Sequence, residues 1–296
     1  MPAVKTEERG DILEIIRKIE ELPSPKFILE QINRVLNNPH SSAIDIGNII
    51  AEDVSTSAKI LKMANSAYYS LPYEVSNVKQ AVMIIGLQTL KSVVLTSSVM
   101  DTFKGGKALD KEYTESFWRH SLSAAILSKI IARRVRPSDL EFHETAFSAG
   151  ILHDIGKMII AAFLPGIHQN KLEYLNEYSV SEFEAEHYVI NRAHNEIGRY
   201  LAETWKLPRS VADVIYFHHN PASTPGDSSL VYITHLSDFL IHDSGQSNYY
   251  GYSRHTTLLD ERTYGRLNLE ENYKDKLMED LNNEYSKAET FLRFSS

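Results

Sequence analysis

The stretch Gly150-Ile-Leu-His-Asp-Ile-Gly-Lys157 places a histidine next to an aspartate inside an apolar segment. Adjacent side chains on a helix point about 100° apart, so His153 and Asp154 can face one site together only where their helix meets that site squarely. Gly150 and Gly156 carry no side chains and therefore allow neighbouring helices to approach this turn closely. Taken alone, the pair is explained equally well by a hydrogen-bonded core histidine and by a functional site.

Histidines recur on apolar helical faces through the second half of the chain. His120 shares a predicted helix face with Phe117 and Ala124, so its side chain is expected to point inward. Three further histidines and one aspartate are candidates of the same kind: His194, His218, His219 and Asp238. One inward histidine is usually a core residue with a backbone partner, but five histidines and two aspartates on five predicted helices are difficult to explain in that way.

These residue types indicate a metal centre. Neutral imidazole and carboxylate donors suit Zn, Mn, Fe or Ni, and thiolate ligands are excluded because the chain has no cysteine. We therefore predict that one or two divalent transition-metal ions are bound by His120, His153, Asp154, His194, His218, His219 and Asp238.

A catalytic role is one interpretation of this pattern, because two ions sharing Asp154 would activate water and clamp a phosphate ester. In that case Lys157, one turn after Asp154, would steady the phosphate and both residues would be catalytic. Lys157 is explained equally well as the ion-pair partner of a carboxylate. The sequence contains no nucleotide-phosphate loop, dinucleotide fingerprint or Ser-His-Asp pattern that would indicate another chemistry.

The chain is predicted to be all-α, because apolar residues recur at helical spacing and no strand-like alternation of any length occurs. In the first half, Ser76 is the expected N-cap of a helix over residues 78–85, and Gly86 is its expected C-terminal stop. The other helices predicted for this half cover residues 12–21, 25–38, 44–52, 55–63 and 87–103.

The second half is predicted to form an HD-type helical bundle, followed by a C-terminal extension. The predicted helices cover residues 113–134, 144–163, 180–205, 208–219 and 229–242, with a loop at 220–227. Residues 246–265 are expected to be irregular, and a last amphipathic helix covers 268–291. The lysine- and glycine-containing stretch 104–107 is the expected linker, so the predicted regions are 1–107, 108–245 and 246–296.

Composition narrows the classes of function. Hydrophobic residues make up 43% of the 296 residues and charged residues 24%, as in ordinary globular proteins. The formal net charge of −8 does not suit a nucleic-acid-binding protein, so no nucleic-acid partner is expected. The longest continuous apolar runs, such as 82–87 and 158–164, are far shorter than the ~18–20 residues of a membrane span. Residues 1–11 lack the apolar core of a signal peptide. A cytoplasmic location without membrane contact is therefore expected.

Several motifs together resemble the HD superfamily, and more specifically the HDOD domain, the HD-related output domain of bacterial signalling proteins. The second half contributes Trp118-Arg-His-Ser121, Leu152-His-Asp-Ile-Gly-Lys157, Trp205-Lys-Leu-Pro208 and Phe217-His-His-Asn-Pro221. The first half contributes Leu22-Pro-Ser-Pro25, Glu52-Asp-Val-Ser55, Lys62-Met-Ala-Asn-Ser66 and Ile84-Ile-Gly-Leu-Gln-Thr-Leu90, in the family's order. The resemblance covers roughly residues 19–242.

The resemblance implies a regulatory module. HDOD domains are similar to HD-GYP cyclic-di-GMP phosphodiesterases but are generally regarded as lacking that activity, and many have lost metal ligands. Here all of the predicted ligands occupy positions at which an HD-GYP-like site would take them. The sequence departs from the enzymes where it has Asn220-Pro-Ala-Ser-Thr-Pro225 in place of a Gly-Tyr-Pro loop, and where Ala193 replaces a common acidic residue.

Two hypotheses follow, and the first is preferred. The first is a stand-alone HDOD signal-transduction protein whose metal centre is structural or senses a ligand, and whose helical first half contacts a signalling partner. The second is a metal-dependent phosphohydrolase acting on a cyclic dinucleotide or another phosphoester. A small phosphoester or nucleotide would be the ligand in either case, and the terminal helix could pair with its copy in a homodimer or dock on its own domain.

Overall fold

The computed structural model describes residues 12–17, 43–52, 54–65, 74–103, 110–178, 180–245 and 258–292. Throughout these residues the regular structure is helical and no strand occurs, which confirms the all-α prediction. The predicted helix over 25–38, the linker at 104–107 and most of the segment 246–265 lie outside the described residues.

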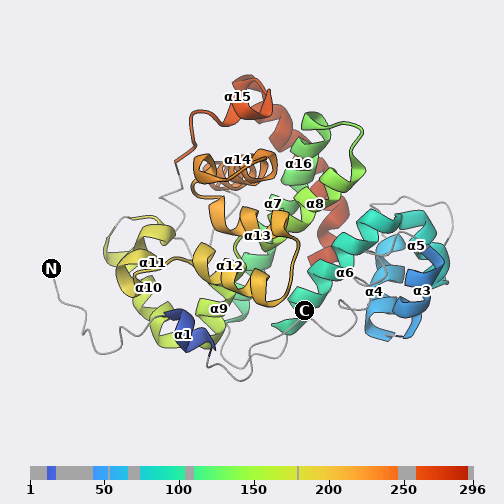
Figure 1. Ribbon diagram of the computed structural model, residues 1–296, viewed down its shortest axis with the longest axis horizontal. Coiled ribbons are helices and arrows are strands. Elements are labelled where there is room, and N and C mark those ends of the chain that lie inside the picture. The colour runs from blue at the N-terminus through green and yellow to red at the C-terminus, as the bar shows by residue number, and fades with distance from the viewer. Residues whose placement is uncertain are drawn as a thin grey trace.

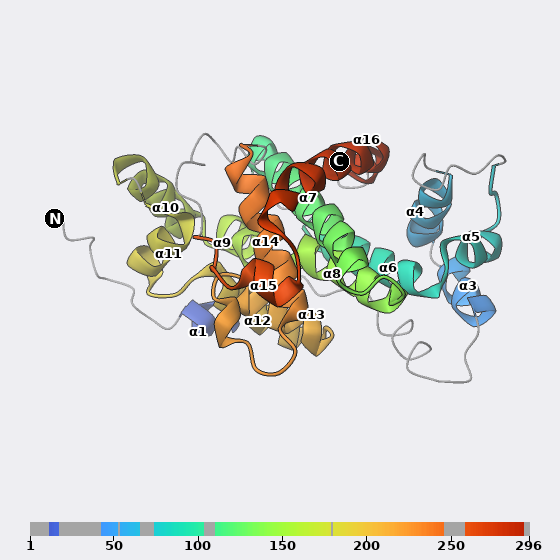
Figure 2. The ribbon, with the colours of Figure 1, turned by 90° about the horizontal axis from the view of Figure 1, so that it is seen from above.

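Most of the helices described in the first half form a small cluster at one end of the molecule (Figures 1 and 2). It contains α3 (Ala43–Glu52), α4 (Val54–Ala64) and α5 (Val78–Ile85), and α6 (Leu87–Thr102) leads from it to the rest of the chain. Gly86 ends α5 with φ 81°, as predicted. The N-cap, however, is Asn77 and not Ser76, because the Asn77 side chain accepts a hydrogen bond from the Lys79 amide. A short α1 (Ile12–Arg17) precedes the cluster in the chain.

The second half is a helical bundle around α7 (Lys111–Val135). Most residues of α7 are buried, so the helix is surrounded by the others. The helices grouped around it are α8 (Leu140–Leu152), α9 (Ile155–Phe163), α12 (His194–Thr204), α13 (Arg209–Phe217) and α14 (Ser229–Asp243), with a 3-10 turn η1 (Pro221–Ser223) before α14. A pair of helices, α10 (Pro165–Glu177) and α11 (Glu182–Ile190), stands at the end opposite α3–α5 (Figures 1 and 2).

Two helices that were predicted to be continuous are interrupted in the structure. The helix predicted over 144–163 is interrupted at His153 and Asp154, which form a turn between α8 and α9. The helix predicted over 180–205 is interrupted at Asn191, which ends α11 in the left-handed conformation at φ 55°. A third difference is α10, which was not predicted because its stretch is polar and buries only Lys171.

The two halves are joined where α6 packs against α8. Ser92 Oγ lies 2.6 Å from Ser148 Oγ, and Thr89 donates a hydrogen bond to Glu144. Lys129 of α7 lies 2.6 Å from the same Glu144 carboxylate and neutralises it inside the interface. This polar contact ties the first half to the helix that ends at His153.

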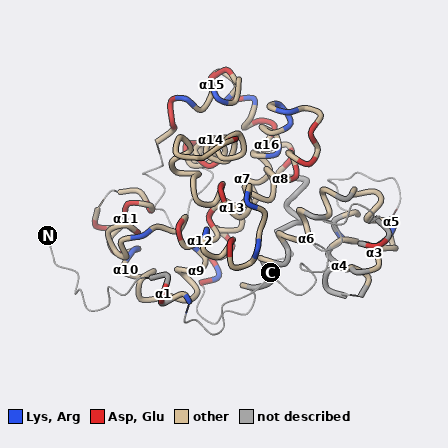
Figure 3. Tube along the Cα trace, in the orientation of Figure 1, with Lys and Arg blue, Asp and Glu red and all other residues tan. Residues whose placement is uncertain are grey.

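The C-terminal extension packs against its own bundle. It contains α15 (Thr263–Leu267), a 3-10 turn η2 (Glu271–Tyr273) and α16 (Lys274–Leu292), so the predicted single helix over 268–291 begins with a separate turn and the predicted irregular segment ends in a helix. Leu277 and Leu281 are buried in the core, and Arg134 of α7 pairs with Asp280 at 2.6 Å. Acidic and basic residues are interspersed over the described bundle (Figure 3).

The segment Leu140–Phe163 is long and apolar enough to cross a membrane by length and composition. Of its most apolar window, 83% is buried inside the protein, as in the core helix of a globular domain. The break at His153 and Asp154 also divides it into α8 and α9.

Candidate metal centre

The turn between α8 and α9 presents His153 and Asp154 to the same site. Both side chains are buried, and His153 Nδ1 lies 2.7 Å from the Gly150 carbonyl oxygen, to which it donates. The interruption of the helix therefore brings the two adjacent side chains together, which a continuous helix would do only if it faced the site squarely.

The glycines on either side allow the close approach that the sequence suggested. A Cβ atom at Gly156 would lie 1.9 Å from the carbonyl oxygen of His194, and one at Gly150 would lie 2.8 Å from that of Ala124. Backbone cannot yield easily to such contacts, so these positions require glycine. Gly156 thus allows the first residue of α12, His194, to rest against the His-Asp turn.

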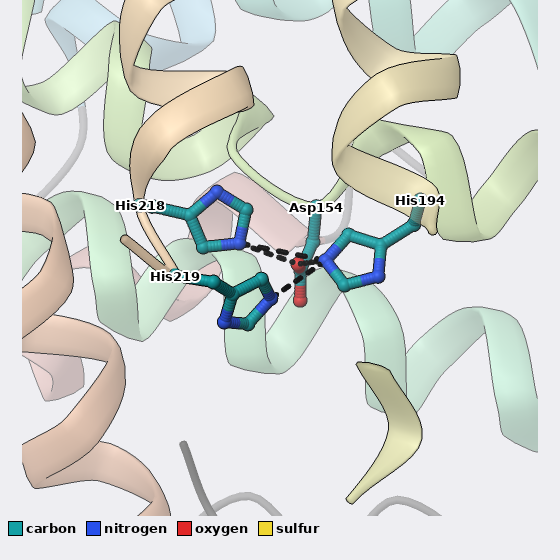
Figure 4. A group of neighbouring side chains, drawn as sticks. All are labelled: Asp154, His194, His218 and His219. Carbon is teal, nitrogen blue, oxygen red and sulfur yellow. Dashed lines mark hydrogen bonds and ion pairs between the residues drawn. The ribbon is translucent and has the colours of Figure 1, made fainter. Parts of the chain in front are cut away.

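The first group of donors surrounds Asp154 Oδ1 (Figure 4). The Nε2 atom of His194 lies 3.1 Å from this oxygen, and that of His218 lies 3.5 Å from it. His219 Nε2 lies 2.9 Å from His194 Nε2. His218 and His219 directly follow α13, so this group joins three parts of the chain.

The second group contains His120 of α7, His153 and Asp238 of α14. Asp238 Oδ1 lies 3.2 Å from His120 Nε2 and 3.6 Å from His153 Nε2. The other oxygen of Asp154, Oδ2, faces this group at 3.3 Å from His153 Nε2. The structure therefore brings all seven predicted ligands together, with one oxygen of Asp154 directed at each group.

The histidines are held with Nε2 facing inward. His194 Nδ1 lies 2.6 Å from a Glu186 carboxylate oxygen, and His218 Nδ1 lies 2.9 Å from the Ile215 carbonyl oxygen. With the Nδ1 proton donated outward, as for His153, the Nε2 atom is the one available to bind a metal ion. Ligating histidines are commonly oriented by such outer partners.

The convergence of these atoms fits a cation. Two pairs of inward Nε2 atoms, His120 with His153 and His194 with His218, lie 3.4 Å apart. Within the described part of the chain, the buried Asp154 Oδ1 and Asp238 Oδ1 accept no hydrogen bond. Buried carboxylate oxygens are costly without a partner, and metal ions supply one. The donor set therefore fits divalent metal binding.

The pKa shifts at the centre also favour the binding of a cation. Burial disfavours the charged form of Asp154, yet His153 and Lys157 hold the pKa of its carboxyl well below its usual range. Burial also opposes protonation of His153, but the Asp154 carboxylate outweighs it and raises the pKa of His153 to about 10. Burial lowers the pKa of His120 to about 4. The carboxylate thus stays charged in the interior and attracts a cation, whether a proton or a metal ion.

The sequence profile of the HDOD domain family matches residues 22–221. The chain belongs to the HDOD family. The matched region contains six of the seven predicted ligands, and Asp238 lies beyond it. Among curated proteins, this HDOD chain is 25% identical over 211 residues to an uncharacterized protein of Treponema pallidum (strain Nichols). The match covers 71% of the chain but only 40% of that protein.

Solved structures show that the HDOD fold is shared. An HDOD domain protein of unknown function from Geobacter sulfurreducens is 24% identical, with a TM-score of 0.72 over 95% of this chain and 94% of that one. A presumed phosphohydrolase from Shewanella amazonensis SB2B is 22% identical, with a TM-score of 0.73 over 95% and 98%. A presumed signal transduction protein from Marinobacter aquaeolei VT8 is 20% identical, with a TM-score of 0.72 over 93% and 60%.

In this HDOD chain Lys157 forms ion pairs with carboxylates. Its Nζ lies 2.6 Å from Asp154 Oδ2 and 3.0 Å from Glu182, and the residue is buried. Of the two sequence-based interpretations of Lys157, the ion pair is therefore the one found in the structure.

A charged ring extends outward from the centre to α10 and α11. Lys171, which is fully buried, lies 2.5 Å from Glu182 and 3.4 Å from Glu186. The charged ring consists of Asp154, Lys157, Glu182, Lys171, Glu186 and His194. The sequence did not reveal Lys171 and Glu182 as members, because their contacts exist only once α10 and α11 fold against α9.

The remaining histidines near the centre differ in role. His235 Nδ1 lies 2.7 Å from the His218 carbonyl oxygen and its Nε2 accepts the Asp260 amide at 3.0 Å, so both ring nitrogens are used structurally. His187 is exposed on α11. His242 lies beside the second group and was not predicted, although its position four residues after Asp238 was a visible signal.

Proposed function

We propose that this HDOD chain is a regulatory signal-transduction protein whose second half binds two divalent transition-metal ions. The observation that carries the proposal is the convergence of five histidine Nε2 atoms on the carboxylates of Asp154 and Asp238. His194, His218, His219 and Asp154 Oδ1 would hold the first ion. His120, His153, Asp238 and Asp154 Oδ2 would hold the second, and Fe, Mn, Zn and Ni all suit these donors.

The spacing of the donors supports this proposal. With bonds of about 2.1 Å, neighbouring ligand atoms lie about 3.0 Å apart around an octahedral ion and about 3.4 Å apart around a tetrahedral one. The contacts from Asp154 Oδ1 to His194 and His218 measure 3.1 and 3.5 Å, within a few tenths of these values. Little rearrangement would therefore be needed to bind an ion.

A path from the centre to the first half supports a regulatory role. Because α8 ends immediately before His153, a shift of this ligand acts directly on α8. Ser148 and Glu144 of the same helix hold Ser92 and Thr89 of α6. We propose that a change in metal or ligand occupancy moves α8 against α6 and so alters the surface that the first half offers to a signalling partner.

A second candidate function is metal-dependent hydrolysis of a phosphoester. The observation that favours it is the position of Asp154, whose two oxygens face the two donor groups as a shared carboxylate would. Two ions in this arrangement supply Lewis acidity and an activated water for hydrolysis. Lys157 is the residue that could bind a phosphate oxygen, but it would first have to leave Asp154 and Glu182. This requirement favours the regulatory role.

The first experiment is elemental analysis of tag-free protein by plasma mass spectrometry, comparing the wild type with the double variant His153→Ala, Asp154→Ala. We expect about two transition-metal ions per wild-type chain and well below one in the variant, which should also melt at a lower temperature. Less than one ion per wild-type chain, even after reconstitution, would refute the metal centre.

An assay of phosphodiester hydrolysis distinguishes the two candidate functions. Metal-loaded wild type should show no hydrolysis of bis-(p-nitrophenyl) phosphate or a cyclic dinucleotide beyond that of the double variant. Turnover by the wild type that the double variant lacks would establish the phosphohydrolase instead.

A further inference from the structure

His242 lies on the solvent-facing side of the second donor group. It belongs to the last turn of α14, four residues after Asp238, so both side chains project from the same face of the helix. Its side chain is 17% exposed, whereas those of His120 and His153 are fully buried. His242 therefore stands between this group and solvent.

The ring nitrogen of His242 is directed at the ligand atom of Asp238. His242 Nε2 lies 3.3 Å from Asp238 Oδ1, the same oxygen that His120 Nε2 approaches at 3.2 Å. The ring centroids of His242 and His120 lie 4.9 Å apart. His242 therefore approaches the same carboxylate oxygen as His120, at the spacing of neighbouring metal ligands.

We propose that His242 is an additional ligand of the second metal ion. This inference rests on the proposed function, since it requires that the second group binds an ion. The second ion would then take donors from His242, His120, His153, Asp238 and Asp154 Oδ2. His242 would close the coordination shell on the side that faces solvent.

His235 shows what a purely structural histidine looks like on the same helix. Both of its ring nitrogens have backbone partners, at the His218 carbonyl and the Asp260 amide. His242 instead points Nε2 toward a carboxylate oxygen that is already surrounded by imidazoles. The two residues therefore form a matched pair for testing whether α14 contributes one ligand or two.

The inference also makes the two ions unequal. The second group would supply five protein donors and the first group four. An ion in the first group would therefore keep more open positions. A small anionic ligand is then expected to bind at the ion held by His194, His218 and His219.

The test is a titration of metal-free protein with Co²⁺, followed by visible absorption, for the wild type, His242→Gln and the control His235→Gln. We expect the wild type to bind about two ions, and His242→Gln to bind one of them at least about tenfold more weakly with an altered spectrum. The melting temperature of metal-free His242→Gln should stay close to that of the wild type. His235→Gln should melt at a lower temperature but keep the ion of the second group at wild-type affinity.

A second measurement does not depend on the folding of a variant. In the Co²⁺-loaded wild type, each bound histidine with a protonated Nδ1 gives a paramagnetically shifted N–H signal in the proton spectrum. Selective labelling of histidine nitrogens counts these signals, and we expect six, one more than the five histidines of the two donor groups supply.

Unchanged Co²⁺ affinity in His242→Gln, or only five shifted signals when both ions are bound, would overturn the inference while leaving the two-ion centre intact. A wild type that binds no Co²⁺ at all would overturn both.

Discussion

At the scale of single residues, His194 illustrates how one predicted ligand is held in place by several contacts. Its backbone rests against Gly156, and its Nδ1 lies 2.6 Å from Glu186. Its Nε2 faces Asp154 at 3.1 Å. The inward position of His194 could be predicted from its apolar neighbours in sequence. The carboxylate behind it could not, because Glu186 approaches only through the left-handed turn at Asn191.

Glu186→Gln should weaken metal binding at the first group. The neutral amide can still accept from His194 Nδ1 but no longer supplies the negative charge that makes this imidazole a better ligand, so we expect a loss of about tenfold in affinity. Chelator competition on the metal-loaded protein measures it. The matched control is Glu203→Gln, an exposed residue of α12 paired with Arg199, which should leave the affinity unchanged. Equal affinities in the two variants would contradict an orienting role for Glu186.

Metal affinity should fall as the pH is lowered. Burial opposes protonation of His194, but the Glu186 carboxylate outweighs it and raises the pKa of His194 to about 8, while that of His153 is raised to about 10. Below about pH 8 the metal-free protein therefore holds a proton on one histidine of each group. Each ion must displace that proton, so its apparent association constant should fall by about tenfold per pH unit between pH 8 and 6. Calorimetry in buffers of different ionisation enthalpy counts the released protons. No release at pH 7 would refute this coupling.

At the scale of helices, the sequence predicted most elements correctly because their apolar periodicity and capping residues agree. The interruption at His153 and Asp154 was missed because the apolar pattern continues across it from α8 into α9. The helix α10 was missed for the opposite reason, since its single buried residue is the charged Lys171. Both differences lie at the candidate site or in its charged ring. The local sequence pattern does not predict the backbone there, because tertiary contacts determine its conformation.

Gly156→Ala should disturb the packing of α12 and with it the first donor group. The added Cβ would lie 1.9 Å from the His194 carbonyl oxygen, so the helix must move. We expect a loss of about 1–3 kcal/mol in the free energy of unfolding, together with weaker metal binding at His194. Urea denaturation and Co²⁺ titration measure the two effects. Gly166→Ala on α10 is the control, because nothing lies within 4 Å of its added Cβ. That variant should be neutral or slightly more stable, and an equal effect at both glycines would contradict the argument.

At the scale of the whole molecule, the centre joins parts of the chain that are far apart in sequence. Its donors come from α7, the turn after α8, the start of α12, the end of α13 and from α14. The seven residues that converge here could be picked out in the sequence because histidines and aspartates on apolar helical faces are uncommon enough to stand out. Their division into two groups around Asp154 could not, since it depends on which carboxylate oxygen each helix presents.

Removal of the metal should therefore loosen the bundle as a unit. A ligand that binds only the folded state, and is present at a concentration about a hundredfold above its Kd, stabilises that state by about 2.7 kcal/mol. For a domain of this size that amounts to about 5–10 °C in Tm per ion. Scanning calorimetry of the metal-loaded protein with and without a chelator measures the shift, and the double variant His153→Ala, Asp154→Ala should show none. If the chelator instead lowers the Tm of both proteins equally, the stabilising ion binds elsewhere. If it changes neither, the helices hold together without the metal, and the centre would then serve only to bind a ligand.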